Sequence, residues 1–244
     1  MHGWDMRTMQ TKSGAFDRHK LLREHLLFSG LPDDIIERLS SYAAMKDVKR
    51  GATIFAKGDV GNSLFAVCDG TVKITSPSAE GKDAVFNLVL EGGIFGEIAL
   101  LDGRTRTATA VAATDCKLMV IDRRDFLPLL RSHHELATKI IDVLCARLRH
   151  TSEQVEDVMF LDLPGRLAKT LLRLVQDNGA PLKNRKLTIT QREIGEMIGM
   201  SRESTNKQLR DWQQRKWISL QRGSISILQP DALAAVAETN ALSD

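Results

Sequence analysis

The residue types most capable of chemistry in this chain gather in one stretch, Phe95–Ala110, which reads FGEIALLDGRTRTATA. One carboxylate, Glu97, precedes the guanidinium of Arg106 and the hydroxyl of Thr107, and small residues lie among them. A buried strand would favour alternating β-branched residues, whereas a catalytic site would need a nucleophile or a base. Arginine makes directed, charge-assisted hydrogen bonds to anions, and small residues let backbone N–H groups approach an anion closely. The stretch therefore predicts a site for a small, polar, negatively charged molecule.

A second stretch, TQREIGEMIGMS, begins at Thr190 and carries the signals of two short helices joined by a tight turn. Thr190 and Glu193 have the spacing of a capping box, in which each side chain satisfies a backbone N–H group of the other residue. Gly199 permits the turn, and Ser201 is a favourable N-cap for a second helix over 202–214. Two short helices joined in this way are typical of a helix-turn-helix.

The second of these helices presents polar side chains that suit the edges of DNA bases. A helix fits the major groove, where Arg and Lys donate to guanine and Glu accepts from cytosine. A hairpin predicted at 218–227, with Arg222 at its tip, adds a wing. Hydroxyls, arginines and helix N-termini suit phosphates, which position a protein without reading sequence. The candidate DNA-contacting residues are Thr190, Arg192, Ser201, Arg202, Glu203, Asn206, Lys207 and Arg222.

Charge is distributed unevenly along the chain. Residues 164–228 hold 13 Lys and Arg against 5 Asp and Glu, whereas residues 1–163 hold 21 against 23. The net charge of the whole chain is only +3. A basic module beside a near-neutral one is expected when one part of a protein meets a polyanion. The balance therefore favours double-stranded DNA as a partner.

The elements that must position these residues indicate an α+β chain of 244 residues, long enough for two modest domains. Residues 17–45 are predicted to be helical, with a turn at Gly30–Asp34. Nine of the 17 glycines fall between Gly51 and Gly103, where short apolar runs alternate with turn residues. This texture predicts short antiparallel strands in a sandwich or barrel, of which a jelly-roll-like β-roll is one form. Its strands are expected at 64–67, 72–74, 85–89, 107–111 and 117–121.

Further along, a heptad seam predicts a long dimerisation helix. Its positions alternate steps of four and three residues: Ala137, Ile141, Leu144, Leu148, Thr151, Val155 and Val158. Such spacing favours pairing with a second copy of the chain over burial within a monomer. Thr151 is polar, as is Ser152 beside it, so both are expected to have hydrogen-bonding partners. A joint is predicted at 160–165, where Asp162 can cap a new helix and Pro164 falls in its first turn.

This order of parts, a β-roll, a dimerisation helix, a hinge and a winged helix-turn-helix, resembles the CRP/FNR family of bacterial transcription regulators over nearly the whole chain. The family's phosphate-binding cassette matches Phe95-Gly-Glu-Ile-Ala-Leu100 and Arg106-Thr-Ala108 residue by residue. The resemblance implies a cyclic nucleotide as allosteric effector and RNA polymerase as a further partner. It also implies three domains: a cyclic-nucleotide-binding β-roll at 16–132, a dimerisation helix and hinge at 133–161, and a DNA-binding winged helix-turn-helix at 162–244.

In such a cassette, Glu97 accepts from the ribose 2′-OH and Arg106 neutralises the cyclic phosphate. The catabolite-activator branch places an adjacent Thr-Ser of the dimer helix against adenine, one residue from each subunit, which implies this role for Thr151 and Ser152. The expected effector is therefore cAMP. Thr107 leaves cGMP open, because cGMP-dependent kinases place Thr at this position to meet guanine. The residues expected to bind the effector are Gly96, Glu97, Ile98, Ala99, Arg106, Thr107, Ala108, Thr151 and Ser152.

The recognition helix departs from the family pattern at one residue. Ser201–Lys207 resembles the Ser-Arg-Glu-x-x-x-Arg of TGTGA readers, with lysine replacing the second arginine. Lysine is a point charge without the bidentate fork of arginine. We therefore expect a palindromic TGTGA-like site, with looser selection at the base that Lys207 meets. A β-roll that senses another effector or none is the alternative, as is a DNA-bending protein without an effector.

Other classes of function find little support. The N-terminus lacks the pattern of a signal peptide, and no apolar run reaches the roughly 20 residues of a membrane span, so a cytoplasmic protein without a membrane partner is expected. His134-Glu-Leu-Ala-Thr138 begins like HExxH but lacks the second zinc-ligating histidine. Cys68, Cys116 and Cys145 lie far apart, and residues 1–67 lack the clustered cysteines of an oxygen sensor. No catalytic residue, metal site or gas-sensing role is predicted.

Overall fold

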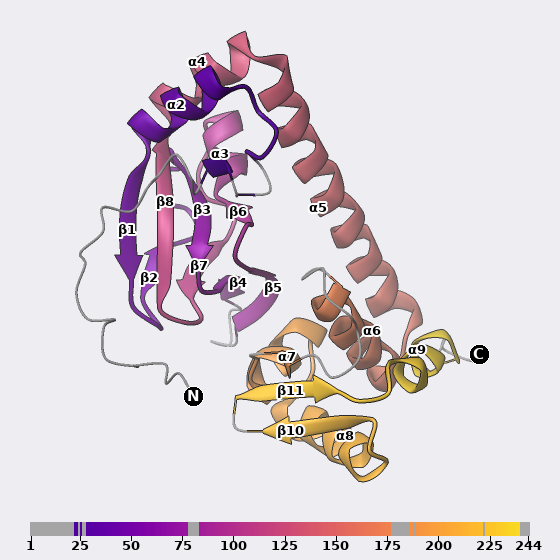
Figure 1. Ribbon diagram of the computed structural model, residues 1–244. Helices are drawn as coiled ribbons and strands as arrows, with labels where there is room; N and C mark the ends of the chain where they lie inside the picture. Colours follow the sequence, from indigo (N-terminus) through magenta and orange to yellow (C-terminus); the bar gives the residue numbers. More distant parts are fainter. Residues whose placement is uncertain are drawn as a thin grey trace, which may run out of the picture.

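The chain forms an N-terminal β-roll and a C-terminal winged module, which one long helix joins (Figure 1). The computed structural model describes residues 22–239 except 24, 26–27, 78–82, 177–185, 188 and 222. The start of the first predicted helix and of the first predicted domain therefore lie outside the described residues. None of the described helices combines the length and the hydropathy that a membrane span needs.

The described strands of the β-roll form two antiparallel four-stranded sheets, in the orders β1-β8-β3-β6 and β2-β7-β4-β5. Between the sheets lies an apolar core that includes Val67, Val72, Phe95 and Leu118. All five strands expected from the sequence are present, which confirms the predicted α+β fold with an antiparallel roll. The strands are β1 Ala44–Val48, β2 Thr53–Phe55, β3 Ser63–Asp69, β4 Val72–Pro77, β5 Asp83–Val89, β6 Ile94–Phe95, β7 Thr109–Ala112 and β8 Cys116–Asp122.

The helix predicted for 17–45 is wrong at its C-terminal end. Helix α2 spans Asp33–Tyr42, and Ala43 after it has an extended backbone with φ −72° and ψ 130°. The chain then enters β1, in which Ala44 pairs with Val120 of β8. Pairing with a strand more than seventy residues away decides the conformation here, since the local sequence AMKDV shows no clear alternation.

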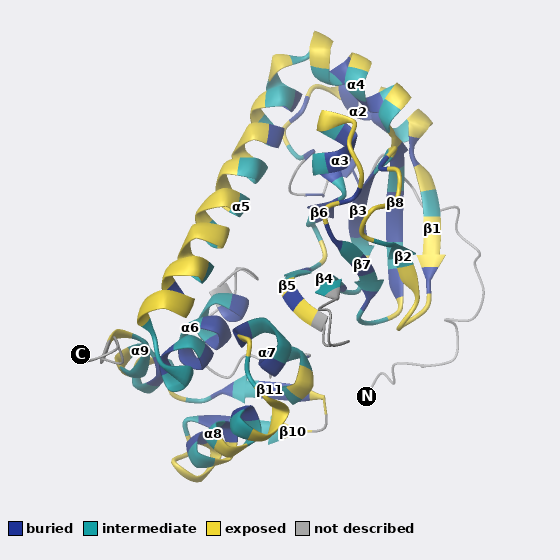
Figure 2. Cartoon of the chain, turned by 180° about the vertical axis from the view of Figure 1, so that it is seen from behind, coloured by how far each residue is buried: buried dark blue, intermediate teal, exposed yellow. Residues whose placement is uncertain are grey.

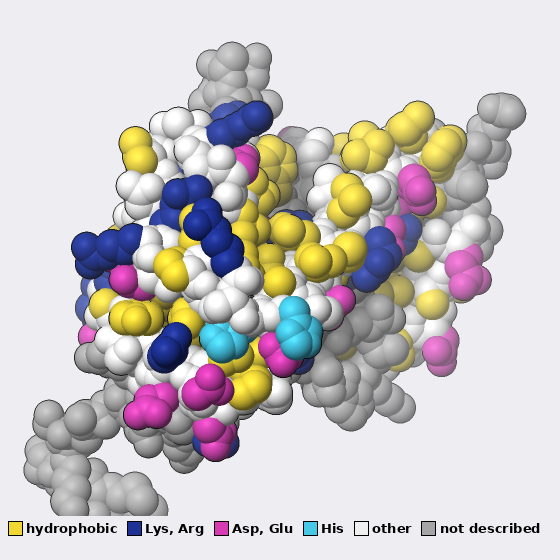
Figure 3. Space-filling view, turned by 90° about the horizontal axis from the view of Figure 1, so that it is seen from above, with side chains coloured by type: hydrophobic (Ala, Val, Ile, Leu, Met, Phe, Trp, Pro, Cys, Tyr) yellow, Lys and Arg dark blue, Asp and Glu magenta, His cyan; other side chains and the backbone are white. Residues whose placement is uncertain are grey.

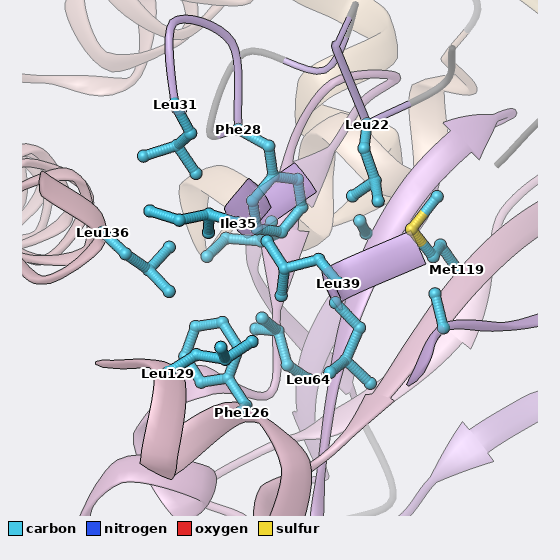
Figure 4. Close-up of a cluster of buried hydrophobic side chains, with 14 of the residues drawn as sticks. Leu22, Phe28, Leu31, Ile35, Leu39, Leu64, Met119, Phe126, Leu129 and Leu136 are labelled. Atoms are coloured by element: carbon cyan, nitrogen blue, oxygen red, sulfur yellow. The ribbon is translucent and has the colours of Figure 1, made fainter. Parts of the chain in front are cut away.

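A second apolar cluster lies where helices cover one end of the roll. Helix α2, helix α4 (Arg123–Ser132) and the first turns of helix α5 (His134–Phe160) meet strands β3 and β8 there. Figure 4 shows these side chains pointing toward one another, with Leu136 reaching in from α5. Asp122 stands at the N-cap position of α4, as expected, but its side chain makes no capping hydrogen bond. This cluster anchors α5 to the roll. The labelled residues are Leu22, Phe28, Leu31, Ile35, Leu39, Leu64, Met119, Phe126, Leu129 and Leu136.

Beyond this cluster α5 is exposed along most of its length (Figure 2). Four apolar residues of the predicted seam stay between 54% and 68% exposed: Ile141, Leu148, Val155 and Val158. Thr151 Oγ1 donates to the carbonyl of Arg147, one turn earlier, at 3.0 Å. The exposed residues of the seam thus form an apolar face on α5, whereas Leu144 packs partly against the cluster described above.

The C-terminal module is a helix-turn-helix with a small sheet of order β10-β11-β9. Its core holds Leu171, Ile194, Leu209 and Trp212, and the second helix buries the two residues predicted for it, Leu209 and Trp212. Together with the β10–β11 hairpin, this confirms the predicted winged helix-turn-helix. The elements are α6 Leu163–Gln176, β9 Lys186–Leu187, α7 Gln191–Ile198, α8 Arg202–Gln214, β10 Ile218–Gln221, β11 Ser224–Ile227 and α9 Pro230–Thr239.

The winged module contacts both helix α5 and strand β5. The joint between α5 and α6 follows the prediction: Asp162 Oδ1 accepts from Gly165 N at 2.9 Å. An ion pair of 2.5 Å joins buried Asp157 of α5 to Lys169 of α6. Strand β5 touches α7, and Leu88 packs against the core of the module. The winged module is therefore held both by the end of α5 and by the edge of the roll.

The surface at the α4 end of the molecule carries both signs of charge. Figure 3 shows Lys and Arg interspersed with Asp, Glu and apolar side chains on this face. This mixture agrees with the near-neutral balance of residues 1–163, and it contrasts with the basic excess of the winged module.

Candidate ligand pocket and nucleic-acid interface

A cavity of about 310 Å³ lies between the β-roll and α5. This volume is at the lower end of the range for sites that hold small molecules. Eight of the nine residues predicted to bind the effector line it. The ninth, Ser152, does not line the cavity of its own chain, and it was expected to act with Thr151 of the other subunit. The eight are Gly96, Glu97, Ile98, Ala99, Arg106, Thr107, Ala108 and Thr151.

The cassette begins at the end of a short strand, which is followed by a short helix. Strand β6 ends at Phe95, and α3 spans Glu97–Asp102. Between them Gly96 has φ +79°, and a Cβ there would lie 2.6 Å from Nη1 of Arg106. Glycine is therefore required at this position, both by the left-handed backbone and by the close approach of the arginine. The turn places the start of α3 against the pocket.

Arg106 is buried, with 4% of its surface exposed. Its Nη1 donates to the Gly96 carbonyl at 2.7 Å and its Nη2 to the Ser63 carbonyl at 2.9 Å. The guanidinium lies over the Phe55 ring, 4.2 Å from the centroid. Burial lowers the pKa of Arg106, and the charge of Glu97 opposes this shift; arginine nonetheless stays protonated in proteins. Its Nε is buried without a hydrogen-bond partner among the residues described, so the pocket holds a fixed cation with unused donor capacity.

Glu97 provides the matching acceptor. It is 1% exposed, and its Oε1 pairs with Nη1 of Arg147, whose Nη2 donates to the Ile94 carbonyl at 3.0 Å. Its Oε2 is buried and has no hydrogen-bond partner within the described part of the chain. A buried carboxylate oxygen is costly unless it accepts a hydrogen bond. A ligand hydroxyl that donates to Oε2 would satisfy it.

Helix α5 forms the opposite wall, on which the sequence pointed to one residue of this chain, Thr151. Arg147, His150, Thr151 and Gln154 all line the cavity. They recur at the three- and four-residue steps that bring side chains to one face of a helix, so extending this period from Thr151 would have found the other three. The pairing of Arg147 with Glu97 joins residues fifty positions apart, and no local pattern signals it. The remaining lining residues missed by the sequence are Phe55, Ile74, Phe86, Asn87 and Phe95.

In the winged module, the outer face of α8 lines a shallow hollow that brings together four predicted residues, Arg202, Glu203, Asn206 and Lys207. Arg202, Glu203 and Lys207 are exposed and free to reach a partner, whereas Asn206 is half-buried. The Oδ1 atom of Asn206 is buried without a hydrogen-bond partner among described residues. Three further residues extend the hollow along the helix: Arg210, Asp211 and Gln214.

The predicted phosphate contacts flank this face. Thr190 Oγ1 accepts from Glu193 N at 3.2 Å, and Glu193 Oε2 accepts from Thr190 N at 2.8 Å, which confirms the capping box. Ser201 Oγ accepts from Ser204 N at 3.1 Å, so both hydroxyls already serve as helix caps. Exposed Arg192 pairs with Glu196 at 2.7 Å. Arg222, at the predicted wing tip, lies outside the described residues.

Comparison with known proteins decides the family. Residues 45–133 match the cyclic nucleotide-binding domain, and residues 165–236 match the Crp-like helix-turn-helix domain. The CRP-like cAMP-activated global transcriptional regulator of Mycobacterium tuberculosis is 32% identical over 212 residues, which cover 85% of this chain and 94% of the relative. The chain belongs to the CRP/FNR family. The cyclic AMP receptor protein of Thermus thermophilus is 29% identical over 211 residues, covering 86% of this chain and 96% of that relative.

Solved structures of other proteins share the fold. FixK2 from Bradyrhizobium japonicum superposes with a TM-score of 0.73 at 16% identity, covering 83% of this chain and 99% of that one. The c-di-GMP-responsive regulator CLP of Xanthomonas campestris gives a TM-score of 0.67 at 23% identity, with 81% and 99% covered. At these identities the likeness concerns the fold alone.

Membership of the CRP/FNR family makes the chain a DNA-binding transcriptional regulator with a cyclic-nucleotide-binding domain, and not an enzyme. The family, the fold class and the two domain types were all predicted from the sequence, and they are confirmed. The individual site residues remain predictions, which the burial and hydrogen bonding described above support.

Proposed function

We propose that this CRP/FNR protein is a cAMP-responsive regulator that binds, as a homodimer, a palindromic TGTGA-like DNA site. The observation that carries the proposal is the pocket, which combines the buried cation of Arg106, the unsatisfied Oε2 of Glu97 and the polar face of α5 around Thr151. A cyclic phosphate, a free 2′-hydroxyl and a purine base match these three features in that order. The M. tuberculosis and T. thermophilus relatives are named as a cAMP-activated regulator and a cyclic AMP receptor protein.

The proposed dimer rests on the exposed apolar face of α5. Water contact with such a stripe is unfavourable, and a heptad seam is covered by a second copy of itself. Within the seam, Arg147 takes a g position and Ser152 an e position, which face each other between the two helices of a parallel coiled coil. Ser152 of a second copy would therefore approach the pocket wall that Arg147 forms. This relation supports an effector site that residues of both subunits complete. The proposed domains of each subunit are residues 16–132, 133–161 and 162–244.

Two copies related by a two-fold axis would present two α8 helices, so the preferred DNA site is proposed to be palindromic. Arg202, Glu203 and Lys207 supply the base contacts. Phosphate contacts come from Thr190, Arg192, Ser201 and Arg222, aided by the basic balance of the module. A regulator bound at a promoter meets RNA polymerase there, which we propose as its protein partner.

A second candidate effector is cGMP, and one residue favours it. Thr107 lines the pocket and is exposed, so its hydroxyl is accessible to a ligand. A hydroxyl at this position can accept from the 2-amino group of guanine. The polar α5 face opposite favours cAMP as the first candidate.

The proposal is tested by calorimetric titration of the nucleotide-stripped dimer with cAMP and, separately, with cGMP. We expect cAMP to bind more tightly than cGMP and to increase the affinity for a TGTGA-containing duplex. Arg106→Ala removes at least two charge-assisted hydrogen bonds of about 1.5–3 kcal/mol each, so we expect a loss of affinity of about 100-fold or more. Exposed Arg104→Ala is the matched control and should bind normally. Absence of binding by either nucleotide would refute the proposal, and tighter binding of cGMP would reassign the effector.

A further inference from the structure

We infer that Gln154 selects adenine over guanine by accepting a hydrogen bond from the 6-amino group of the base. The inference rests on the proposed binding of a cyclic nucleotide in the pocket, and it concerns a residue outside the phosphate-binding cassette. Gln154 lies on the pocket face of α5, close to one turn after Thr151.

The orientation of the Gln154 carboxamide follows from its hydrogen bond. Its Nε2 donates to the backbone carbonyl of Phe86 in β5 at 3.0 Å. A carbonyl oxygen only accepts, so the amide nitrogen must face β5 and cannot exchange places with the oxygen. No donor to Oε1 is present among the described residues. The carboxamide therefore offers a ligand an acceptor, already held in place by the strand.

The other groups fix which end of the ligand meets Gln154. A phosphate held by Arg106 and a ribose hydroxyl held by Glu97 leave the base toward α5, the wall opposite the cassette. On that wall, both Nη atoms of Arg147 are engaged, one with Glu97 and one with the Ile94 carbonyl. Thr151 donates its hydroxyl proton to the Arg147 carbonyl and so faces the base with lone pairs. Neither Arg147 nor Thr151 therefore sets a strong donor beside the Gln154 acceptor.

Adenine and guanine differ most sharply at the position that such an acceptor reads. Adenine carries an amino donor at position 6, and guanine carries a carbonyl acceptor there. The amino group satisfies Oε1 of Gln154, whereas the carbonyl would set two acceptors against each other. Polar mismatch of this kind is the strongest source of discrimination, because it leaves a partly buried group unpaired.

The test compares two ligands that differ only at position 6: cAMP and purine riboside 3′,5′-cyclic monophosphate, which has hydrogen in place of the amino group. Calorimetry on the full-length protein gives the affinity ratio of the two. One neutral hydrogen bond predicts that the wild-type protein prefers cAMP by about 3- to 10-fold through Gln154. Gln154→Met keeps the length of the side chain but removes the acceptor, and we expect the ratio to fall by that factor. Glu153→Met, on the exposed face, is the matched control and should keep the wild-type ratio.

An unchanged ratio in Gln154→Met, with the 6-hydrogen analogue still bound normally, would overturn the inference while leaving the proposed function intact. Failure of the wild-type protein to bind either ligand would overturn both.

Discussion

Replacing Glu97 with glutamine tests whether the pocket holds a ribose. Glu97 is almost fully buried, and its two oxygens differ: Oε1 pairs with Arg147, whereas Oε2 has no partner among the described residues. In Glu97→Gln the amide oxygen must stay toward Arg147, since a guanidinium only donates. The NH2 group then takes the place of Oε2. The variant thus changes a charged acceptor into a neutral donor at the atom expected to meet the 2′-hydroxyl.

The size of the effect follows from the charge on that oxygen. A hydrogen bond to a charged group contributes about 1.5–3 kcal/mol, whereas one between neutral groups contributes about 0.5–1.5 kcal/mol. The wild-type protein should therefore prefer cAMP to 2′-deoxy-cAMP by about 10- to 100-fold. In Glu97→Gln the hydroxyl can accept from the NH2 group instead, and the preference should fall to about 2- to 10-fold.

Calorimetric titration of both proteins with both nucleotides measures the four affinities. Comparing ratios within each protein cancels any general weakening caused by the altered contact with Arg147. Glu91→Gln changes an exposed carboxylate in the turn before β6 and should keep the wild-type ratio. Equal affinity of the wild-type protein for the two nucleotides would refute the assignment of Glu97 to the ribose, even if cAMP binds tightly.

Three further predictions address other parts of the chain. Leu148→Glu introduces a charge on the exposed seam of α5, and we expect sedimentation to show monomers where the wild type forms dimers; a stable dimer would exclude the seam as the interface. Lys207→Ala should weaken binding to a TGTGA duplex by about 1–3 kcal/mol in fluorescence anisotropy, and Lys207→Arg should sharpen selection at one base; unchanged binding in both would remove Lys207 from the interface. Burial lowers the pKa of His25 to about 4, below the unfolded value of about 6.5, so the unfolded chain binds more protons between these values. The free energy of unfolding should fall by up to roughly 3 kcal/mol as pH falls through this window. Urea unfolding at pH 7.5 and pH 5 measures this fall, and we expect His25→Phe to abolish it.

The parts of the fold that the sequence predicts well are those in which the interaction lies within a few residues. The Thr190–Glu193 capping box is such a case, because the spacing is itself the hydrogen-bonding geometry. Asp162 and Gly165 at the joint are another. Strand β1 shows the opposite situation: Ala44 and its neighbours become a strand only because β8 supplies the pairing partner. Such long-range pairing overrides weak local preference.

The candidate site divides in the same way. The cassette residues and Thr151 could be named in advance, because their types and order form a pattern along the chain. The helical period also leads from Thr151 to Arg147, but it does not give the role of Arg147, since that depends on the carboxylate of Glu97, which only the fold brings to it. The same holds for Gln154, whose orientation is set by a carbonyl of β5. Contacts across the pocket are tertiary, so they become visible only once both walls are placed.

The pocket and α8, the proposed DNA-reading helix, belong to separate apolar cores. A bound nucleotide can therefore influence α8 only through the elements that touch both. Among the described residues, α5 lines the pocket and holds the winged module through the Asp157–Lys169 ion pair. Strand β5 does the same, since Phe86 faces the pocket while Leu88, two residues on, packs against the module. A ligand shifts an equilibrium between two arrangements only by its difference in affinity for them. That difference can therefore arise where a ligand meets α5 and β5, or at Glu97, which pairs with Arg147 of α5. Arg106 offers no such route, because it is held by carbonyls of the roll.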